Sequence, residues 1–225
     1  KILPVETHYA PQRRHWTLRG GPGGSKGWLA CSAPFLSLSA VTMQVHRVRS
    51  VEYRPSGARA CAFSGDGSRL AVARDDGDVE VWAVATWLPE LRIPAGKSAP
   101  VSCLVWASSG MHGHERLFAA GKDGKIREVD FAACGWRNVC DSFGGAVWSI
   151  ALNGAEDTLA VGCEDGGVRL FDLSSSSIEF GSQLATVGAR VLSLAWHPHD
   201  EVLFAGTAAG DIVGWDVASA TGAAA

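Results

Sequence analysis

The chain has 225 residues, of which 47% are hydrophobic and 19% are charged, so it can bury a core and is not an intrinsically disordered chain. No uninterrupted apolar run approaches the roughly 20 residues needed to cross a bilayer, which argues against a membrane protein. Residues 1–59 carry nine Lys and Arg against two acids, whereas residues 60–225 carry eleven against twenty-one. The excess of acidic residues in 60–225 argues against a strongly basic nucleic-acid-binding domain.

Residues 1–42 are rich in Gly and Pro and show no period. Two interpretations stay open: upstream sequence read through before a start at Met43, or a disordered N-terminal extension. The run GGPGGSKG at 20–27 is reminiscent of a phosphate-binding loop, but it lacks the GKS/T order and no clear strand precedes it. A Gly-rich linker is the better interpretation.

The segment after Met43 is the most informative charged stretch. In MQVHRVRSVEYRPSGAR, the run HRVRSVEY alternates like a strand and would place Arg47 and Arg49 on one face. We interpret Arg47, Arg49, Arg54 and Arg59 as a solvated edge, with contact to RNA phosphates or to an acidic partner as the alternative.

The rest of the chain repeats. A leucine followed seven residues later by a glycine recurs at intervals of 47, 42 and 44 residues, as Leu70 and Gly77, Leu117 and Gly124, Leu159 and Gly166, and Leu203 and Gly210. Five residues past these glycines stand Trp82, Val129, Phe171 and Trp215, and an aspartate follows in the last three copies. This period and ending are typical of the blades of a WD-repeat propeller.

Each copy contains the elements of a blade. In three copies an Asp-Gly pair separates two strand-like segments, as in a tight hairpin, and the fourth has Ala209-Gly210. We interpret Asp76, Asp123 and Asp165 with their glycines as turn formers, because a catalytic residue has no reason to recur once per blade. A further strand precedes each hairpin, and a fourth strand per blade is expected near 86–93, 136–143 and 178–185. The second copy contains a loop insertion within ASSGMHGHER (107–116).

Four-stranded units at this spacing must stack around an axis to bury both faces. The predicted fold is therefore all-β: a WD-repeat β-propeller over residues 43–217, incomplete, with about four blades of a larger, seven-bladed propeller. The repeats lie near 57–94, 99–143, 145–185 and 188–217, and residues 218–225 form a tail. An isolated product is expected to expose unpaired strand edges.

The aromatic and sulfur-containing residues are interpreted as structural. Trp82, Phe171 and Trp215 occupy a repeating blade position, while Trp106, Trp148 and Trp196 lie in the first strands, which favours packing over a surface for stacking bases. The six cysteines include no CxxC pair, which favours reduced thiols in a reducing compartment. For Cys134 and Cys140 we favour core or strand positions over a site.

No catalytic or cofactor-binding pattern stands out. HGHE at 112–115 could supply metal ligands, but it lies in the variable insertion and zinc needs further correctly spaced ligands. Neither GxSxG nor HExxH occurs. We therefore expect no enzymatic activity, no cofactor, no metal and no small-molecule substrate.

A specific resemblance narrows the function. The stretch from Val45 to Trp82, led by HRVRxxxYxPSGxR, together with DSFGGAVWSIAL, VGCEDGGVRLFDL and RVLSLAWHP, resembles the N-terminal propeller of the cirhin family. That family comprises longer WD-repeat proteins of the nucleolar small-subunit processome. The resemblance implies a scaffold in the nucleus, in the nucleolus, that assembles with other processome proteins and contacts precursor rRNA through the complex. It implies a role in the maturation of small-subunit rRNA, with a link to ribosomal DNA transcription. Blade cores alone would equally suit a general WD-repeat adaptor, such as a ubiquitin-ligase substrate receptor or a signalling scaffold.

Overall fold

The computed structural model describes residues 56–94, 100–108 and 114–217. In this part of the chain the strands form four separate antiparallel sheets, and no helix accompanies them. The all-β prediction is therefore confirmed. Among the described residues, no helical segment has the length and apolar character required to span a membrane.

Three sheets have four strands and the last has three, each in chain order. The first contains β1 (Ala58–Phe63), β2 (Arg69–Arg74), β3 (Val79–Ala83) and β4 (Leu88–Ile93). The second contains β5 (Val101–Ala107), β6 (Arg116–Gly121), β7 (Lys125–Asp130) and β8 (Gly135–Asp141). The third contains β9 (Val147–Leu152), β10 (Thr158–Cys163), β11 (Val168–Asp172) and β12 (Glu179–Gln183). The fourth contains β13 (Val191–Trp196), β14 (Val202–Thr207) and β15 (Ile212–Asp216).

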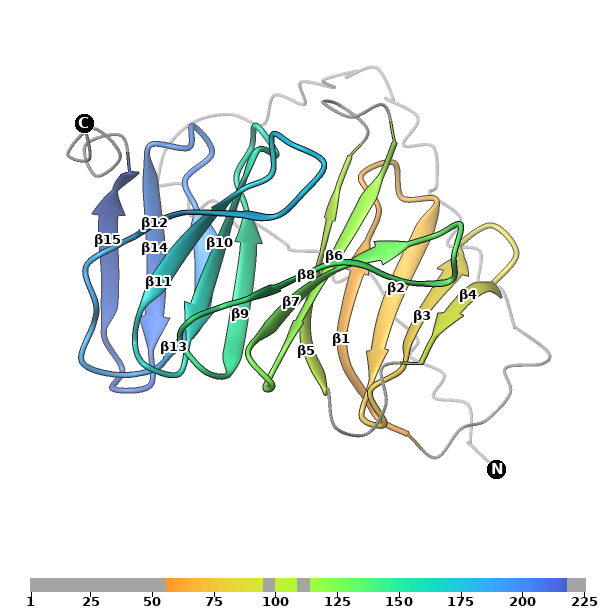
Figure 1. The fold of residues 1–225 in the computed structure, drawn as a ribbon, viewed down its shortest axis with the longest axis horizontal. Coiled ribbons are helices and arrows are strands. Elements are labelled where there is room, and N and C mark those ends of the chain that lie inside the picture. The colour runs from red at the N-terminus through yellow and green to blue at the C-terminus, as the bar shows by residue number, and fades with distance from the viewer. Residues whose placement is uncertain (1–55, 95–99, 109–113, 218–225) are drawn as a thin grey trace, which may run out of the picture. The chain divides into compact units, whose positions relative to one another are not determined.

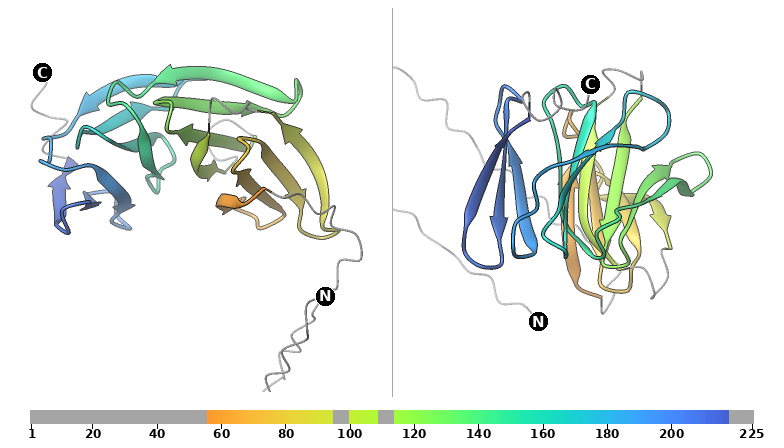
Figure 2. Two further views of the ribbon diagram at one scale, coloured as in Figure 1. Left: turned by 90° about the horizontal axis from the view of Figure 1, so that it is seen from below. Right: turned by 60° about the vertical axis from the view of Figure 1, so that its left-hand side comes forward.

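The four sheets follow one another in chain order (Figure 1, Figure 2). Contacts between neighbouring sheets involve their first strands, because β1 lies against β5, β5 against β9, and β9 against β13. The later strands of each sheet run outward from this set. Sheets that meet along their first strands are the arrangement that a propeller requires.

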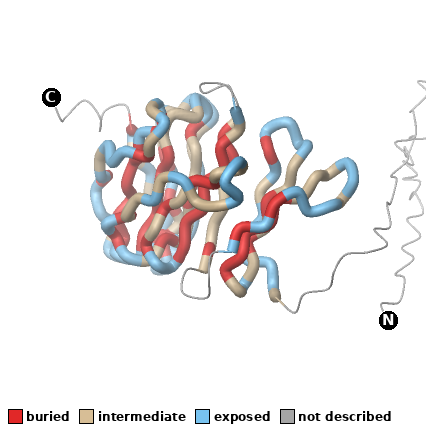
Figure 3. Tube along the Cα trace, turned by 45° about the vertical axis from the view of Figure 1, so that its right-hand side comes forward, coloured by how far each residue is buried: buried red, intermediate tan, exposed pale blue. Residues whose placement is uncertain are grey.

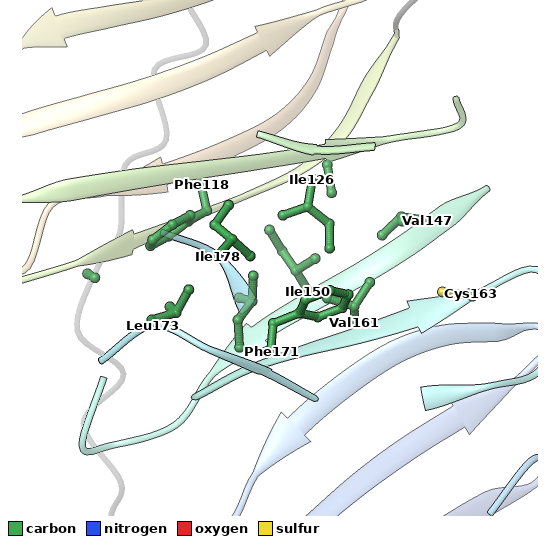
Figure 4. Close-up of a cluster of buried hydrophobic side chains, with 12 residues drawn as sticks. Phe118, Ile126, Val147, Ile150, Val161, Cys163, Phe171, Leu173 and Ile178 are labelled. Atoms are coloured by element: carbon green, nitrogen blue, oxygen red, sulfur yellow. The ribbon is translucent and has the colours of Figure 1, made fainter. Parts of the chain in front are cut away.

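The core lies between the sheets rather than within one of them. Between the second and third sheets, Phe118 and Ile126 face Ile150, Val161 and Phe171, and most of this cluster is fully buried (Figure 4). Equivalent clusters join the first sheet to the second and the third to the fourth. Burial concentrates in the middle strands, such as β6 and β11, whereas β1, β8 and β12 contain no buried residue (Figure 3).

Two tryptophans also join neighbouring sheets. The indole Nε1–H of Trp106 donates to the carbonyl oxygen of Ala62 at 2.9 Å, and that of Trp196 donates to Ala151 at 3.1 Å. Each bond crosses from one first strand to the preceding one. Both rings therefore pack between blades while their one polar atom is satisfied.

The hairpin glycines Gly77, Gly124, Gly166 and Gly210 all have positive φ, between 74° and 93°. Gly166 also has tight surroundings, since a Cβ there would overlap the carbonyl oxygen of Val187. In the first three hairpins the aspartate Oδ1 accepts a hydrogen bond from the backbone N–H two residues later, as Asp165 does from Gly167 at 2.8 Å. Such Asx bonds stabilise a turn locally.

The last sheet leaves an apolar face uncovered. Phe118 and Ile126 are fully buried, whereas the residues at the same repeat positions, Phe204 and Ile212, are 43% and 81% exposed. The face that each earlier sheet buries against its successor is thus open on the fourth. This is the pattern of an incomplete propeller.

Candidate interaction surface

A β-bulge recurs at the same place in every first strand. The register shifts between Ala58 and Ala60 in β1, and the three other first strands have the same irregularity. The residues that fall in these bulges are Arg59, Ser102, Trp148 and Leu192. A bulge re-aims the side chain of its extra residue, and each blade carries a different side chain at this position.

Of Arg47, Arg49, Arg54 and Arg59, only Arg59 lies within the described residues. Its Nε lies 2.6 Å from Asp75 Oδ1, in the hairpin of the same sheet, and both side chains are substantially exposed. A carboxylate partner thus offsets its positive charge. Arg47, Arg49 and Arg54 lie outside the described residues.

Trp148 has surroundings unlike those of the other first-strand tryptophans. Its ring is partly exposed, and its indole N–H donates to the carboxylate of Glu164 rather than to a carbonyl oxygen of a neighbouring blade. Two cations from adjacent sheets approach the ring: Lys122 Nζ lies 4.9 Å from its centroid and Arg190 Cζ lies 5.4 Å away. Trp148 therefore differs from Trp106 and Trp196 in packing against charged side chains of both neighbouring sheets.

The charges around Trp148 are unequally paired. Arg190 forms an ion pair of 3.3 Å with Glu164, and Glu164 also accepts the bond from Trp148. Lys122 is exposed and forms no ion pair with any carboxylate among the described residues. The group Lys122, Trp148, Glu164 and Arg190, called here the Trp148 cluster, therefore carries a net positive charge.

A buried ionic network joins the second and third sheets. Glu128, fully buried in β7, accepts two bonds from Arg116, at 2.9 and 3.1 Å, and further bonds from Arg137 and Asn138. Arg116, only 3% exposed, also donates to the carbonyl oxygen of Leu173 at 2.9 Å, across the blade boundary. Burial alone would raise the pKa of Glu128, but the bonds from its cationic and amide partners outweigh it and hold that pKa below its usual value.

Two hairpin aspartates have partners beyond the turn itself. Asp123 pairs with Arg127, and Asp165 Oδ2 lies 2.7 Å from Arg169 Nη2. The bond from Arg169 holds the pKa of Asp165 below its usual value. These carboxylates therefore serve ion pairs that strengthen the hairpin, as well as the turn bonds described above.

The predicted blade aromatics occupy three different environments. Phe171 is fully buried, and Trp215 is partly buried against the cluster between the third and fourth sheets. Trp82 is partly exposed and donates its indole N–H to Glu80 at 3.1 Å.

A pocket of about 330 Å³ lies beside the second sheet. Its lining includes Arg69, Glu115, Phe131 and Arg137. Arg69 already pairs with Glu115 at 3.2 Å and with Glu90 at 3.0 Å, and its guanidinium lies over the Phe131 ring. Arg137 pairs with Glu128. Since these cations are already paired, the pocket offers less unpaired charge than the Trp148 cluster.

The described cysteines are all free thiols. Burial raises the pKa of Cys103 to about 12 and also raises the pKa of Cys163 and Cys140. These three thiols are therefore protonated at neutral pH and are poor nucleophiles. Cys134 is exposed, in the turn between β7 and β8, so its predicted core or strand position is wrong. Within the described ranges, no group of three His, Cys, Asp or Glu is placed to hold a metal ion.

Comparison with known families decides the nature of the repeat. The model of the family "WD domain, G-beta repeat" matches residues 40–83 and 138–172. The chain contains WD repeats. Among solved structures, the WD-repeat sheets resemble the computationally designed Ika4 protein with a TM-score of 0.61, covering 74% of this chain and 95% of that one. At 17% identity this likeness concerns the fold alone.

Curated relatives share more sequence with these WD repeats. The human U3 small nucleolar RNA-associated protein 4 homolog is 39% identical over 165 residues, which make up 73% of this chain and 23% of that protein. U3 small nucleolar RNA-associated protein 4 of Saccharomyces cerevisiae is 34% identical over 183 residues, 76% of this chain and 23% of that protein. The chain thus spans about a quarter of the length of these relatives.

Proposed function

We propose that the chain is part of a cirhin-family protein and acts as a non-catalytic scaffold in small-subunit processome assembly. The observation that carries the proposal is its 39% identity to the human U3 small nucleolar RNA-associated protein 4 homolog, which extends through 165 residues. On this proposal its partners are other processome proteins, with precursor rRNA reached through the complex. It works in the nucleolus, in the maturation of small-subunit rRNA, with a link to ribosomal DNA transcription.

The segment DSFGGAVWS, which carries part of the resemblance to the cirhin family, supports an interaction role because its aromatic side chains are exposed or partly exposed. In DSFGGAVWS, Phe143 is 62% exposed and Trp148 is partly exposed, so neither aromatic side chain is buried in the propeller core. Phe143 packs edge-on against the exposed ring of Phe180, with centroids 5.7 Å apart. Exposed aromatic side chains that the core does not require are suited to contact with a partner protein.

Affinity purification of the tagged full-length protein, followed by mass spectrometry and RNA sequencing, tests the proposal. We expect recovery of processome proteins together with precursor rRNA. Phe143→Ala is expected to reduce this recovery several-fold. Val139→Ala, which shortens an exposed side chain in β8, is the matched control and is expected to leave it unchanged. Recovery of ubiquitin-ligase components without RNA would instead support the adaptor interpretation and overturn the proposal.

Both interpretations of Arg47, Arg49, Arg54 and Arg59, a solvated edge and contact with RNA phosphates or an acidic partner, stay predictions. Arg59 is already paired with Asp75, so any phosphate bound there must compete with that carboxylate.

A further inference from the structure

Trp148 combines three features that inter-blade packing does not require. It occupies a bulge, its ring is partly exposed, and cations from the sheets on both sides approach it. The other described first-strand tryptophans, Trp106 and Trp196, instead donate to backbone carbonyls of the preceding blade. Trp148 therefore lies among charged side chains of three consecutive sheets rather than in an apolar contact between two of them.

Glu164 holds this arrangement in place. Its carboxylate accepts the indole N–H, which restricts the rotation of the ring, and it pairs with Arg190 at 3.3 Å. In the first sheet the repeat positions of Trp148 and Glu164 are occupied by Arg59 and Asp75, which form an ion pair instead. A bulge residue bonded to a hairpin carboxylate is therefore common to the first and third sheets, whereas only the third has an aromatic ring at the bulge.

We propose that the Trp148 cluster binds a nucleotide of single-stranded RNA, with the base stacked on Trp148 and phosphates contacted by Lys122 and Arg190. Base stacking on an aromatic ring beside cations is the usual way in which proteins hold single strands. Lys122 is exposed and forms no ion pair with a described carboxylate, so it can move from the ring to a phosphate and leave a ring face to the base.

The ring favours a nucleic acid over an acidic peptide. A carboxylate side chain could use the two cations, but it has no π-face to place against the indole, whereas every base has one. The choice of RNA over DNA rests on the proposed function. The acidic character of the chain as a whole predicts a local and weak contact, one that adds to binding within a larger assembly.

Fluorescence anisotropy of a labelled 12-nucleotide uridine-rich RNA, with the full-length protein at low salt, tests the assignment. Trp148→Leu is expected to weaken binding about 5- to 150-fold, the range measured for loss of one stacked base. Trp148→Phe retains a ring and is expected to stay within about threefold of wild type. Lys122→Gln should make the slope of log K against log salt shallower by about 0.7, the value for one phosphate contact on a single strand.

Lys125→Gln is the matched control, because it removes the same charge from a lysine that pairs with Asp141 at 2.9 Å. It is expected to change affinity less than Lys122→Gln. RNA binding that is unchanged in Trp148→Leu would overturn the proposal, as would poly-glutamate binding that depends on Trp148 while RNA does not bind. Tighter binding of DNA of the same sequence would overturn the assignment to RNA.

The affinity purification described above separates this inference from the proposed function. If the wild-type protein recovers processome proteins and Trp148→Leu binds RNA normally, only the Trp148 assignment fails. If RNA binding depends on Trp148 but no processome proteins are recovered, the scaffold proposal fails while the nucleotide contact stands.

Discussion

Glu128→Gln should destabilise the protein by about 3–5 kcal/mol, the usual cost of breaking a buried ion pair. The substitution leaves the buried guanidinium of Arg116 without its bidentate carboxylate partner. It also weakens the bonds that Arg137 and Asn138 make to the same carboxylate. Urea unfolding of the purified chain, followed by circular dichroism, measures this loss as a lower midpoint.

Two further variants identify the cause of that loss. The double substitution Arg116→Met with Glu128→Leu removes both charges from the buried site, so it should be more stable than Glu128→Gln alone. Lys125→Gln breaks an exposed pair and should cost no more than about 1 kcal/mol. A Glu128→Gln variant that loses less than about 1 kcal/mol would show that the network does not hold the second and third sheets together.

The same network gives the stability a pH dependence. The pKa of Glu128 is lower in the folded state than its usual value of about 4.3, so its contribution is present above that pH and is lost as pH falls through the folded value. We therefore expect the urea midpoint of the wild-type protein to decrease as the pH is lowered below about 4. The urea midpoint of the double variant, which lacks the Glu128 carboxylate, should decrease less over the same pH range.

Phe118→Ala is expected to cost about 3–5 kcal/mol, because it leaves a cavity between the second and third sheets. The repeat supplies a matched control in Phe204→Ala. Phe204 has the same register in the fourth sheet but is 43% exposed, so its truncation should cost less than about 1 kcal/mol in this chain. Urea midpoints of the two variants make the comparison, and a cost below about 1 kcal/mol at Phe118 would contradict close packing between these blades.

The period of the sequence predicts most of the fold because it reports an interaction that every blade shares. The leucines of the repeat mark the second strand of each sheet, as Leu117 does in β6 and Leu159 in β10, where both are fully buried. The loop insertion of the second copy falls between β5 and β6, as its position in 107–116 predicts. The outermost strands also lie within two residues of the predicted stretches.

The sequence was less informative where one blade departs from the others. Glu128 occupies the position that Val81 and Leu170 fill in neighbouring blades, so a charge at an apolar repeat position was the signal that could have located the network. Its partner Arg116 gave no comparable signal, because Arg69 stands at the same position in the first copy.

Trp148 differs from Trp106 and Trp196 because of the bulge in β9. Strand alternation assigns each side chain to a face, but a bulge shifts the register by one residue and redirects the side chain. A hydrophobic period carries no mark of such a shift. The orientation of the Trp148 side chain therefore follows from the strand pairing and not from the period.

Depletion of the protein from growing cells tests the central proposal most directly, with the ratio of small- to large-subunit rRNA and their precursors measured on RNA blots. A processome scaffold predicts accumulation of unprocessed precursor and a fall in small-subunit rRNA relative to large-subunit rRNA, both restored by the wild-type protein. A normal ratio with normal precursor levels after depletion would contradict the proposed function.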